Sequence, residues 1–482
     1  MTNKFYKFIA FGFLLTIVGA CGDFGDLNKN PNQPVSVSTA TMLSGAERAV
    51  SSVVGSTLGA RWAQHISDIT YTEYTRYQDY QQDFSSWYTT PLQNLKTYID
   101  VNSDPETAAD AAVSGSNANQ IAVAKILQSY YYHYLTDLWG PIPYSEALKG
   151  LEGILLPKYD SQEDIYKGII SNIEEALDLF DGGAPPKGDY IFGGDIDRWK
   201  QFGNTIKMQA ALRMSDISPD FASNKFNEAI SDGVITSDLF YPYLAETNNQ
   251  NPWYASFITR TDFAISEHLA NFLEATGDPR LYRFADPTVN SVLSGNPQWV
   301  GMPYGLENSS YQPTNVSYPN SQTVKGQDSK LPIYTVAQVE FALAEAVVRG
   351  WRGGDAETHY KNAIRASLSQ WGAEFDTEQD FDDFYNQPDV RWNGADWKTN
   401  FARQKWIGLY IQGWEAYAEW RRLDAPQFVQ PETPLNPSGL TPKRIMYSNL
   451  EANLNSANYQ AAINAWLGGK NADDTPLWWD VH

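Results

Sequence analysis

Residues 404–422 read QKWIGLYIQGWEAYAEWRR, and this stretch decides the fold class. Its large aromatic residues recur every three or four positions, which is the period of one helix face: Trp406, Tyr410, Trp414 and Tyr417. We therefore predict one strong helix from about Phe401 to Leu423 with these four side chains turned inward. A helix with so apolar a face must pack against other helices, so the stretch favours a mainly α-helical protein.

Other segments show the same period and predict helical hairpins. Ser161 is followed by an acid three residues later, the spacing of a helix start, and Gly182-Gly183 ends the stripe that follows. Apolar residues at the same helical spacing, each set forming one face of a predicted helix (an apolar stripe), also occur at 121–138, 199–210, 336–347 and 360–371. Only a short loop separates the last two stripes, so they must pack antiparallel. Residues 355–364 resemble the second helix of a tetratricopeptide unit.

One long stretch, from about 231 to 331, lacks this regularity. It is dense in Gly, Pro, Asn, Tyr and Trp, and it is too long for a connecting loop. We predict an irregular, functional lobe inserted among the helical hairpins.

Composition excludes several classes of function. The 482 residues include 57 acids against 35 bases, a net charge of -22, which disfavours binding to nucleic acid or to anionic lipid surfaces. A single cysteine excludes an intramolecular disulfide and a multi-thiolate metal site. The sequence also lacks the motifs of zinc peptidases, serine hydrolases, phosphate loops and dinucleotide-binding folds.

The position of that cysteine predicts a lipid anchor. Lys4 and Lys7 precede an uncharged apolar stretch, and Val18-Gly19-Ala20 leads directly into Cys21. This order is typical of a bacterial lipoprotein signal peptide at 1–20, with Cys21 as the lipidated residue. An ordinary secretory leader is the alternative. Residues 21–36 read as the lipidated cysteine with a flexible tether, and 37–482 as a single domain.

Five segments carry a family resemblance: the lipobox with Asp26–Pro34, DLWGPIPY at 137–144, GDPRL at 277–281, residues 404–422, and WWD at 478–480. In this order they resemble the SusD/RagB-like outer-membrane lipoproteins of Bacteroidetes. The resemblance implies a SusD-like fold with four tetratricopeptide-like hairpins and a loop-rich ligand-binding lobe. It further implies a lipid-anchored protein of the outer membrane, facing the cell exterior, that is partnered with a SusC-like TonB-dependent transporter.

Two stretches offer the flat aromatic faces and polar edge groups that a sugar ring needs. In the first, tyrosines recur every third residue from Tyr71, and Tyr74, Tyr77 and Tyr80 are the predicted contacts. In the second, inside the lobe, the predicted contacts are Trp253, Tyr254, Trp299, Tyr304 and Asn308. The alternative is structural: the tyrosines can form one face of a buried helix, and the lobe aromatics can fill gaps between loops.

Metal chemistry has little support in the sequence. The five histidines are scattered, so we expect no metal site and no cofactor. An acidic run offers oxygen ligands for a structural calcium ion, but it lacks the glycine and spacing of an EF-hand: Asp376, Glu378, Asp380, Asp382 and Asp383. A solvated helix face is the alternative.

The leading hypothesis is therefore a non-catalytic surface lipoprotein that captures a nutrient oligomer, preferably an oligosaccharide, and delivers it to its transporter. An oligopeptide is the alternative ligand. Two further alternatives remain: a helical-barrel glycoside hydrolase on the same anchor, and a structural partner of the transporter that binds no ligand.

Overall fold

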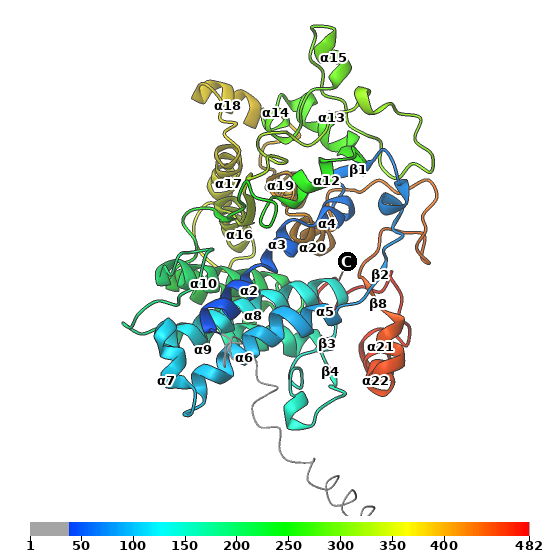
Figure 1. Ribbon diagram of the computed structural model, residues 1–482. Coiled ribbons are helices and arrows are strands. Elements are labelled where there is room, and N and C mark those ends of the chain that lie inside the picture. Colours follow the sequence, from blue (N-terminus) through cyan, green and yellow to red (C-terminus); the bar gives the residue numbers. More distant parts are fainter. Residues whose placement is uncertain (1–37, 482) are drawn as a thin grey trace, which may run out of the picture. The chain divides into compact units, whose positions relative to one another are not determined.

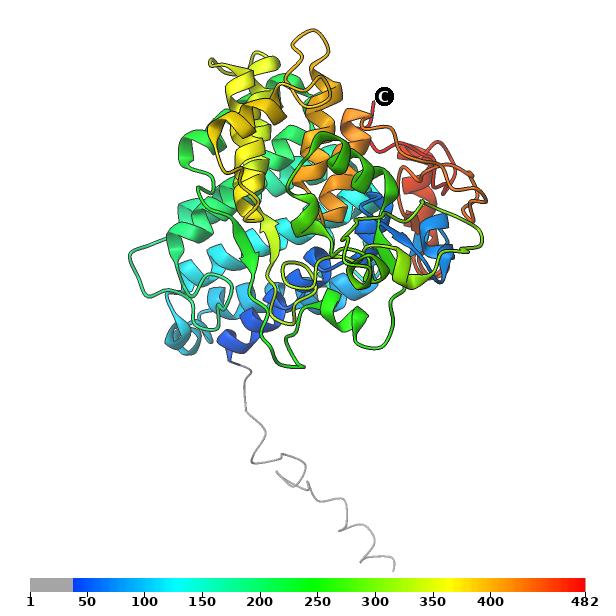
Figure 2. The ribbon, with the colours of Figure 1, turned by 90° about the horizontal axis from the view of Figure 1, so that it is seen from above.

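The structure, a computed structural model, describes residues 38–481 (Figures 1 and 2). The predicted signal peptide at 1–20, the lipidation site Cys21 and the tether at 21–36 lie outside the described residues. From Thr39 onward the chain forms one compact unit. Helices dominate the described part, and its strands occur in two-stranded pairs.

Consecutive helices pack against each other in pairs, which confirms the mainly α-helical prediction (Figure 1). In order along the described chain these pairs are α8 (Asn117–Trp139) with α9 (Gln162–Leu179), α10 (Ile196–Arg213) with α11 (Pro219–Asp232), α16 (Val336–Val348) with α17 (Ala356–Gln370), and α19 (Trp397–Gly408) with α20 (Gly413–Leu423). Neighbouring pairs also touch, since α9 contacts α10 and α16 contacts α19. The result is a continuous helical body.

Capping residues set the starts of these helices. The Oγ of Ser161 accepts a hydrogen bond from the backbone N–H of Asp164 at 3.1 Å, as its spacing predicts. Thr335 and Gln338 form a complete capping box at the start of α16, and Asp355 caps α17. Because these signals are local, the sequence alone places these helix starts.

Shorter elements complete the described chain. Before α8 lie α2 (Thr39–Glu47), α3 (Val50–Val54), α4 (Thr57–Trp62), α5 (Ser85–Trp87), α6 (Gln93–Ser103) and α7 (Ala108–Ala111). Short helical turns are η3 (Thr72–Arg76), η4 (Tyr88–Leu92), η5 (Ala112–Ser114), η6 (Gly150–Glu152) and η7 (Pro313–Asn315). Later helices are α18 (Glu378–Tyr385), α21 (Asn449–Leu454) and α22 (Ser456–Trp466).

The single helix predicted over Phe401–Leu423 is wrong, because the chain changes direction between α19 and α20. Ile411 adopts a left-handed conformation with φ 63°, after α19 ends at Gly408 and before α20 begins at Gly413. The inward orientation was predicted correctly, since the four aromatic residues at 406, 410, 414 and 417 are all buried.

Glycine allows α20 to approach α4 closely. A Cβ atom added to Gly413 would lie 2.1 Å from the backbone nitrogen of Ala60, and one added to Gly59 would lie 2.8 Å from the Trp414 ring. Only glycine fits these two positions. This contact joins segments far apart in the sequence, so it is a tertiary effect that the local aromatic spacing does not reveal.

Pairs of short strands fasten distant segments together. Strand β1 (Ile66–Asp68) pairs antiparallel with β6 (Phe263–Ile265), and β2 (Gln81–Gln82) pairs parallel with β8 (Met446–Tyr447). The other pairs are antiparallel, β3 (Ile142–Pro143) with β4 (Tyr159–Asp160) and β5 (Leu239–Tyr241) with β7 (Leu331–Tyr334). The β1–β6 pair connects the N-terminal region to the loop-rich lobe.

The lobe at 231–331 consists mainly of loops, as predicted. Its helices α12 (Pro252–Phe257), α14 (Leu281–Phe284) and α15 (Val289–Leu293) are short. The ten-residue helix α13 (Glu267–Thr276) was not predicted.

Buried charges connect the helix pairs. Arg213 of α10 binds Asp137 of α8 and Glu419 of α20. Arg422 of α20 forms a two-point ion pair with Glu345 of α16, with N–O distances of 2.5 and 2.6 Å. A buried charge is costly unless it is paired, so each partner depends on the other. Two of the sequence motifs, 137–144 and 404–422, therefore meet in the core.

Candidate functional site

The two stretches predicted to bind ligand meet at a tight turn that follows β1. The turn is η3, and it lies between Tyr71 at φ 56° and Tyr77 at φ 66°. Both residues are in the left-handed region, which costs a residue other than glycine about 1–2 kcal/mol. Such strain is often found at functional sites, so this turn is a candidate position for ligand contacts.

Asp68 anchors the turn from inside the protein. One of its carboxylate oxygens accepts a hydrogen bond from the backbone N–H of Thr75 at 3.0 Å, and the other accepts one from Nε of Arg61 at 2.8 Å. Burial raises the pKa of Asp68 to about 6, against the lowering effect of Arg61 and Thr75. The carboxylate is therefore ionised at neutral pH and holds both partners.

Tyr71 and Tyr74, which we call the tyrosine platform, project from this turn. The two residues are 52% and 38% exposed. The guanidinium of Arg260 lies 5.1 Å from the Tyr71 ring centre, and that of Arg61 lies 5.2 Å from the Tyr74 ring centre. Cation–π contacts at exposed sites are worth about 0.5–1 kcal/mol each, so these two contacts favour the ring orientations seen here. Pre-positioned, partly exposed rings can stack on the C–H face of a sugar.

The loop-rich lobe contributes polar groups beside the platform. The hydroxyl of Thr72 donates to the backbone carbonyl of Glu307 at 3.0 Å, and the Glu307 carboxylate lies 3.9 Å from Nη2 of Arg76. Asn308 follows in the chain and is exposed. Aromatic faces and hydrogen-bonding edge groups thus come together from two segments that are distant in sequence.

The structure sorts the predicted tyrosines into different environments. Tyr74 is exposed on the platform, whereas Tyr80 is half-buried and its backbone carbonyl accepts from the N–H of Met446 at 2.8 Å. Tyr77 must be corrected, because it is fully buried, hydrogen-bonds Thr441 at 3.0 Å and packs edge-on against Trp62. A ring in this position has no face for a ligand.

Two aromatic residues of the lobe need the same correction. Trp253 is fully buried against Phe263, and Tyr304 is buried with its hydroxyl donating to the backbone carbonyl of Arg61 at 2.9 Å. They fill the interior of the lobe, as the structural alternative supposed.

Trp299 and Tyr254 are half-buried and remain predicted contacts. The Trp299 ring packs edge-on against Tyr282 at 4.7 Å, and its indole N–H donates to the backbone carbonyl of Ala285 at 2.9 Å. Both of these Trp299 contacts lie within the lobe itself.

The sequence analysis missed the guanidinium groups of the platform. Arg260 reaches Tyr71 because the β1–β6 pairing continues past its strands, with the backbone N–H groups of Ile69 and Thr70 both donating to the carbonyl of Asp262. Nε of Arg260 also lies 3.1 Å from the Asp262 carboxylate. No local motif marks these arginines, since only tertiary strand pairing brings them to the tyrosines.

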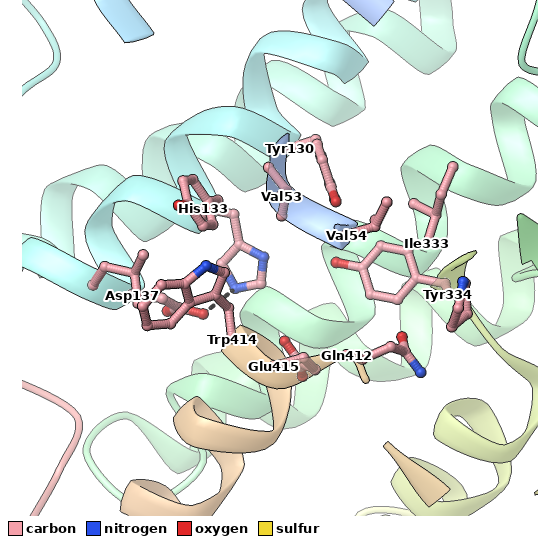
Figure 3. A pocket seen from close by; sticks show the side chains of 13 residues that line it. Val53, Val54, Tyr130, His133, Asp137, Ile333, Tyr334, Gln412, Trp414 and Glu415 are labelled. Carbon is pink, nitrogen blue, oxygen red and sulfur yellow. Dashed lines mark ion pairs between the residues drawn. The ribbon is translucent and has the colours of Figure 1, made fainter. Parts of the chain in front are cut away.

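A small cavity lined by both polar and apolar side chains lies among α3, α8, β7 and α20 (Figure 3). Its volume is about 60 Å³, enough for a few water molecules and too small for a sugar ring. His133, Asp137 and Glu415 line it together with both amide atoms of Gln412, which lack hydrogen-bond partners within the described residues. We interpret the cavity as part of the buried polar network.

Burial and neighbouring charges set the ionisation of His133 and Asp137 beside this cavity. Burial lowers the pKa of His133, so the ring is neutral at neutral pH. Burial alone would raise the pKa of Asp137, but Arg213 and the other partners of the carboxylate together outweigh that effect, and the pKa is lowered. Asp137 is therefore a charged structural residue at the end of α8.

The acidic run at 376–383 does not gather into a metal cage. Glu378 pairs with Arg365 at 2.5 Å, and the Asp380 carboxylate accepts from the backbone N–H of Thr377 in a capping box. Within residues 38–481, no group of three or more histidine, cysteine or carboxylate side chains is placed to hold a metal ion.

Comparisons with known proteins identify the family of the chain. A family model described as starch-binding and associating with the outer membrane matches residues 31–448. The chain belongs to this SusD-like family. Members of the SusD-like family are binding proteins that associate with the outer membrane. No curated protein sequence matches the chain.

Solved structures show the same fold. A chitin-binding protein is 27% identical with a TM-score of 0.78, and the alignment covers 92% of this chain and 100% of that one. A SusD homologue from Bacteroides fragilis is 23% identical with a TM-score of 0.79, over 92% and 100% of the two chains. Another from Bacteroides uniformis is 21% identical with a TM-score of 0.74, over 92% and 99%. In the part of this SusD-like protein that the structure describes, we find no helix suited by length and apolarity to cross a membrane.

Proposed function

We propose that this SusD-like protein captures a glycan oligomer at the cell surface and delivers it, unchanged, to a SusC-like TonB-dependent transporter. The observation that carries the proposal is the convergence of two predicted ligand stretches at one place. The partly exposed rings of Tyr71 and Tyr74 lie next to the lobe segment at Glu307 and Asn308. This combination suits the apolar faces and hydroxyl edges of a sugar.

The proposed binding step uses preorganisation. Arg260 and Arg61 hold the two platform rings, so little side-chain entropy is lost when a sugar stacks on them. Glu307 and Asn308 then accept or donate hydrogen bonds at the sugar edge. Each contact is weak, and several along an oligomer add up to useful affinity. No bond in the ligand is broken.

Glycan is the preferred ligand class for two reasons. The platform is aromatic, and a solved structure with this fold and 27% identity is named a chitin-binding protein. Oligopeptide is the second ligand class, because peptide side chains also stack on aromatic walls.

Anchoring forms part of the proposal. Cys21 carries the lipid, and the residues after it link the anchor to the folded body on the outer face of the outer membrane. Substituting Cys21→Ser should move the protein from the membrane fraction to the soluble fraction. Unchanged fractionation and an unmodified mass for the Cys21 peptide would reject this part.

Isothermal titration with panels of neutral oligosaccharides and oligopeptides tests the binding function. The double variant Tyr71→Ala/Tyr74→Ala should weaken binding of the recognised oligosaccharide by at least about tenfold, since two stacking contacts are lost. Trp466→Ala, which removes an exposed aromatic residue of α22, is the matched control and should bind normally. Binding of peptides alone, or an unaffected double variant, would overturn the glycan assignment.

Deleting the gene tests the delivery function. Uptake of the one glycan that binds should slow, while uptake of monosaccharides stays normal. If growth on that glycan is unchanged, the protein is not the capture component. If uptake slows although the purified protein binds no glycan, a purely structural role beside the transporter is favoured.

A further inference from the structure

A larger hollow lies on different elements from the tyrosine platform. It is a groove of about 680 Å³ lined by α13, α19 and the segment that follows α20. This volume is in the range of small-molecule sites. The residues that carry the argument are His268, Phe272, Asp389, Lys398, Arg403 and Trp406.

The floor of the groove is a stack of rings. The His268 imidazole lies parallel to the Trp406 indole at 5.4 Å and 15°, and His65 approaches the same indole at 5.2 Å. The Trp406 indole N–H donates to the backbone carbonyl of Ala63 at 2.7 Å. The floor is therefore held rigidly before any ligand binds.

His268 brings an unused polar atom to this floor. Its Nε2 is buried and has no hydrogen-bond partner within the described residues. Burial lowers the pKa of His268 to about 4, so the imidazole is neutral at neutral pH and can act as donor or acceptor. A buried polar atom without a partner is unfavourable, and a ligand atom would satisfy it.

One wall carries a positioned but weakly paired guanidinium. Arg403 lies 4.9 Å from the ring centre of Phe272, and its Nη1 is 3.4 Å from the carboxylate of Asp389. Charge-assisted hydrogen bonds are usually about 2.7–2.9 Å, so this contact is loose. The Asp389 side chain is 71% exposed, which lets it move away. Lys398, on the same helix, adds a second positive charge to the groove.

We propose that this groove is a second binding site, which takes a carboxylate-bearing unit of an oligomer. The ligand carboxylate replaces Asp389 on the planar fork of Arg403, a geometry that carboxylates match with two parallel hydrogen bonds. Lys398 supplies further positive charge, and His268 binds a hydroxyl or amide of the ligand. Asp424 also lines the groove but is exposed, so solvent and salt screen its charge.

The charges of the protein bear on where an acidic ligand binds. Its net charge is -22, and the platform has the carboxylates of Glu307 and Asp262 beside it. A uronic acid sugar and a peptide C-terminus both carry the required carboxylate. The proposal names this shared chemistry, and the probes below separate the two sources.

Titration of the full chain with charged probes and their neutral counterparts tests the proposal. The probes are trigalacturonate against galactotriose, and trialanine against trialanine amide. We expect one acidic probe to bind at least about tenfold more tightly than its neutral counterpart, because the charged contacts to Arg403 and Lys398 are lost in the latter. Trigalacturonate binding identifies a sugar site, and trialanine binding identifies a peptide site.

Three variants give the test its controls. Arg403→Gln should weaken the acidic probe at least about tenfold, and Lys398→Gln should weaken it about threefold while disturbing the core less. Arg365→Gln is the matched control, since Arg365 also lies over a ring, Phe381, and pairs with Glu378 at the surface. Circular dichroism checks that each variant folds.

The platform variant Tyr71→Ala/Tyr74→Ala should bind the acidic probe normally, which separates this site from the proposed glycan platform. The proposal is overturned if neither acidic probe binds at millimolar concentration. It is also overturned if folded Arg403→Gln and Lys398→Gln both bind the probe like the unaltered protein.

Discussion

Replacing Glu345 by glutamine tests whether buried ion pairs hold the helix pairs together. Both carboxylate oxygens of this residue accept hydrogen bonds from Arg422, at 2.5 and 2.6 Å, and Nε of Arg349 donates to one of them at 2.8 Å. The Glu345 and Arg422 side chains are fully buried. Burial alone would raise the pKa of Glu345, but Arg422 and Arg349 outweigh it and lower the pKa from 4.5 to about 2.

The lowered pKa sets the size of the effect. At about 1.4 kcal/mol per pKa unit, the shift corresponds to about 3 kcal/mol of stability at neutral pH. Breaking a buried ion pair costs about 3–5 kcal/mol, which agrees. Because the folded-state pKa of Glu345 is depressed, its contribution is complete above about pH 4.5 and is lost as the pH falls toward 2. The difference between the original protein and Glu345→Gln should therefore shrink to about 1 kcal/mol at pH 3.

Urea unfolding followed by circular dichroism, at pH 7 and pH 3, measures this difference. The control is Glu378→Gln, which breaks a two-point pair with Arg365 at the surface, with N–O distances of 2.5 and 3.2 Å. That variant should lose less than about 1 kcal/mol, because water screens an exposed pair. The reasoning is refuted if Glu345→Gln costs no more than the control at pH 7, or if its cost is the same at both pH values.

Three further predictions concern stability. Gly413→Ala should lower the free energy of unfolding by at least about 3 kcal/mol or abolish soluble expression, because the added Cβ meets backbone atoms. Gly150→Ala is the control: its Cβ meets no atom within 4 Å, so the free energy of unfolding should change by less than about 1 kcal/mol. Burial lowers the pKa of His65 to about 3, so the free energy of unfolding should fall as the pH drops from 6.5 toward 3. Urea unfolding across that pH range should show a less steep fall for His65→Gln. Arg280→Lys should lower the melting temperature by several degrees in calorimetry, since lysine cannot reproduce the buried two-point pair with Asp278. An unchanged melting temperature would contradict this.

Helices were predictable where their signals are local. The cap at Ser161 and the apolar stripes act within a few residues of the chain. The break before α20 was not predictable in the same way. It depends on the close contact of Gly413 with Gly59 and Ala60, which only the folded chain creates.

The candidate site was predictable as a region and not residue by residue. Tyr74 and Tyr77 are three residues apart in the same repeat, yet one is 38% exposed and the other is fully buried. The left-handed conformations of Tyr71 and Tyr77 at the two ends of η3 separate the two environments, and spacing alone cannot show this. Arg260 joins the site through strand pairing, for which the sequence offers no local sign.

The segments that carry the family resemblance also contain buried charged residues that stabilise the fold. Asp137, Arg280 and Glu419 are buried and ion-paired within the described residues. Asp137 and Glu419 both bind Arg213 of α10 and so join helices from different pairs. Arg280 pairs with Asp278, two residues earlier, and donates to Ser367 of α17 and Gln404 of α19. Each buried charge is costly without its partner. The motifs therefore reflect the fold, whereas the exposed turn at η3 and the lobe are the segments that we propose contact the ligand.

A structure of the protein with its recognised oligosaccharide bound tests the central claim most directly. We predict sugar rings stacked on Tyr71 and Tyr74, with their edges hydrogen-bonded to Glu307 or Asn308. Sugar bound elsewhere, with these tyrosine rings left in solvent, would contradict the proposed platform.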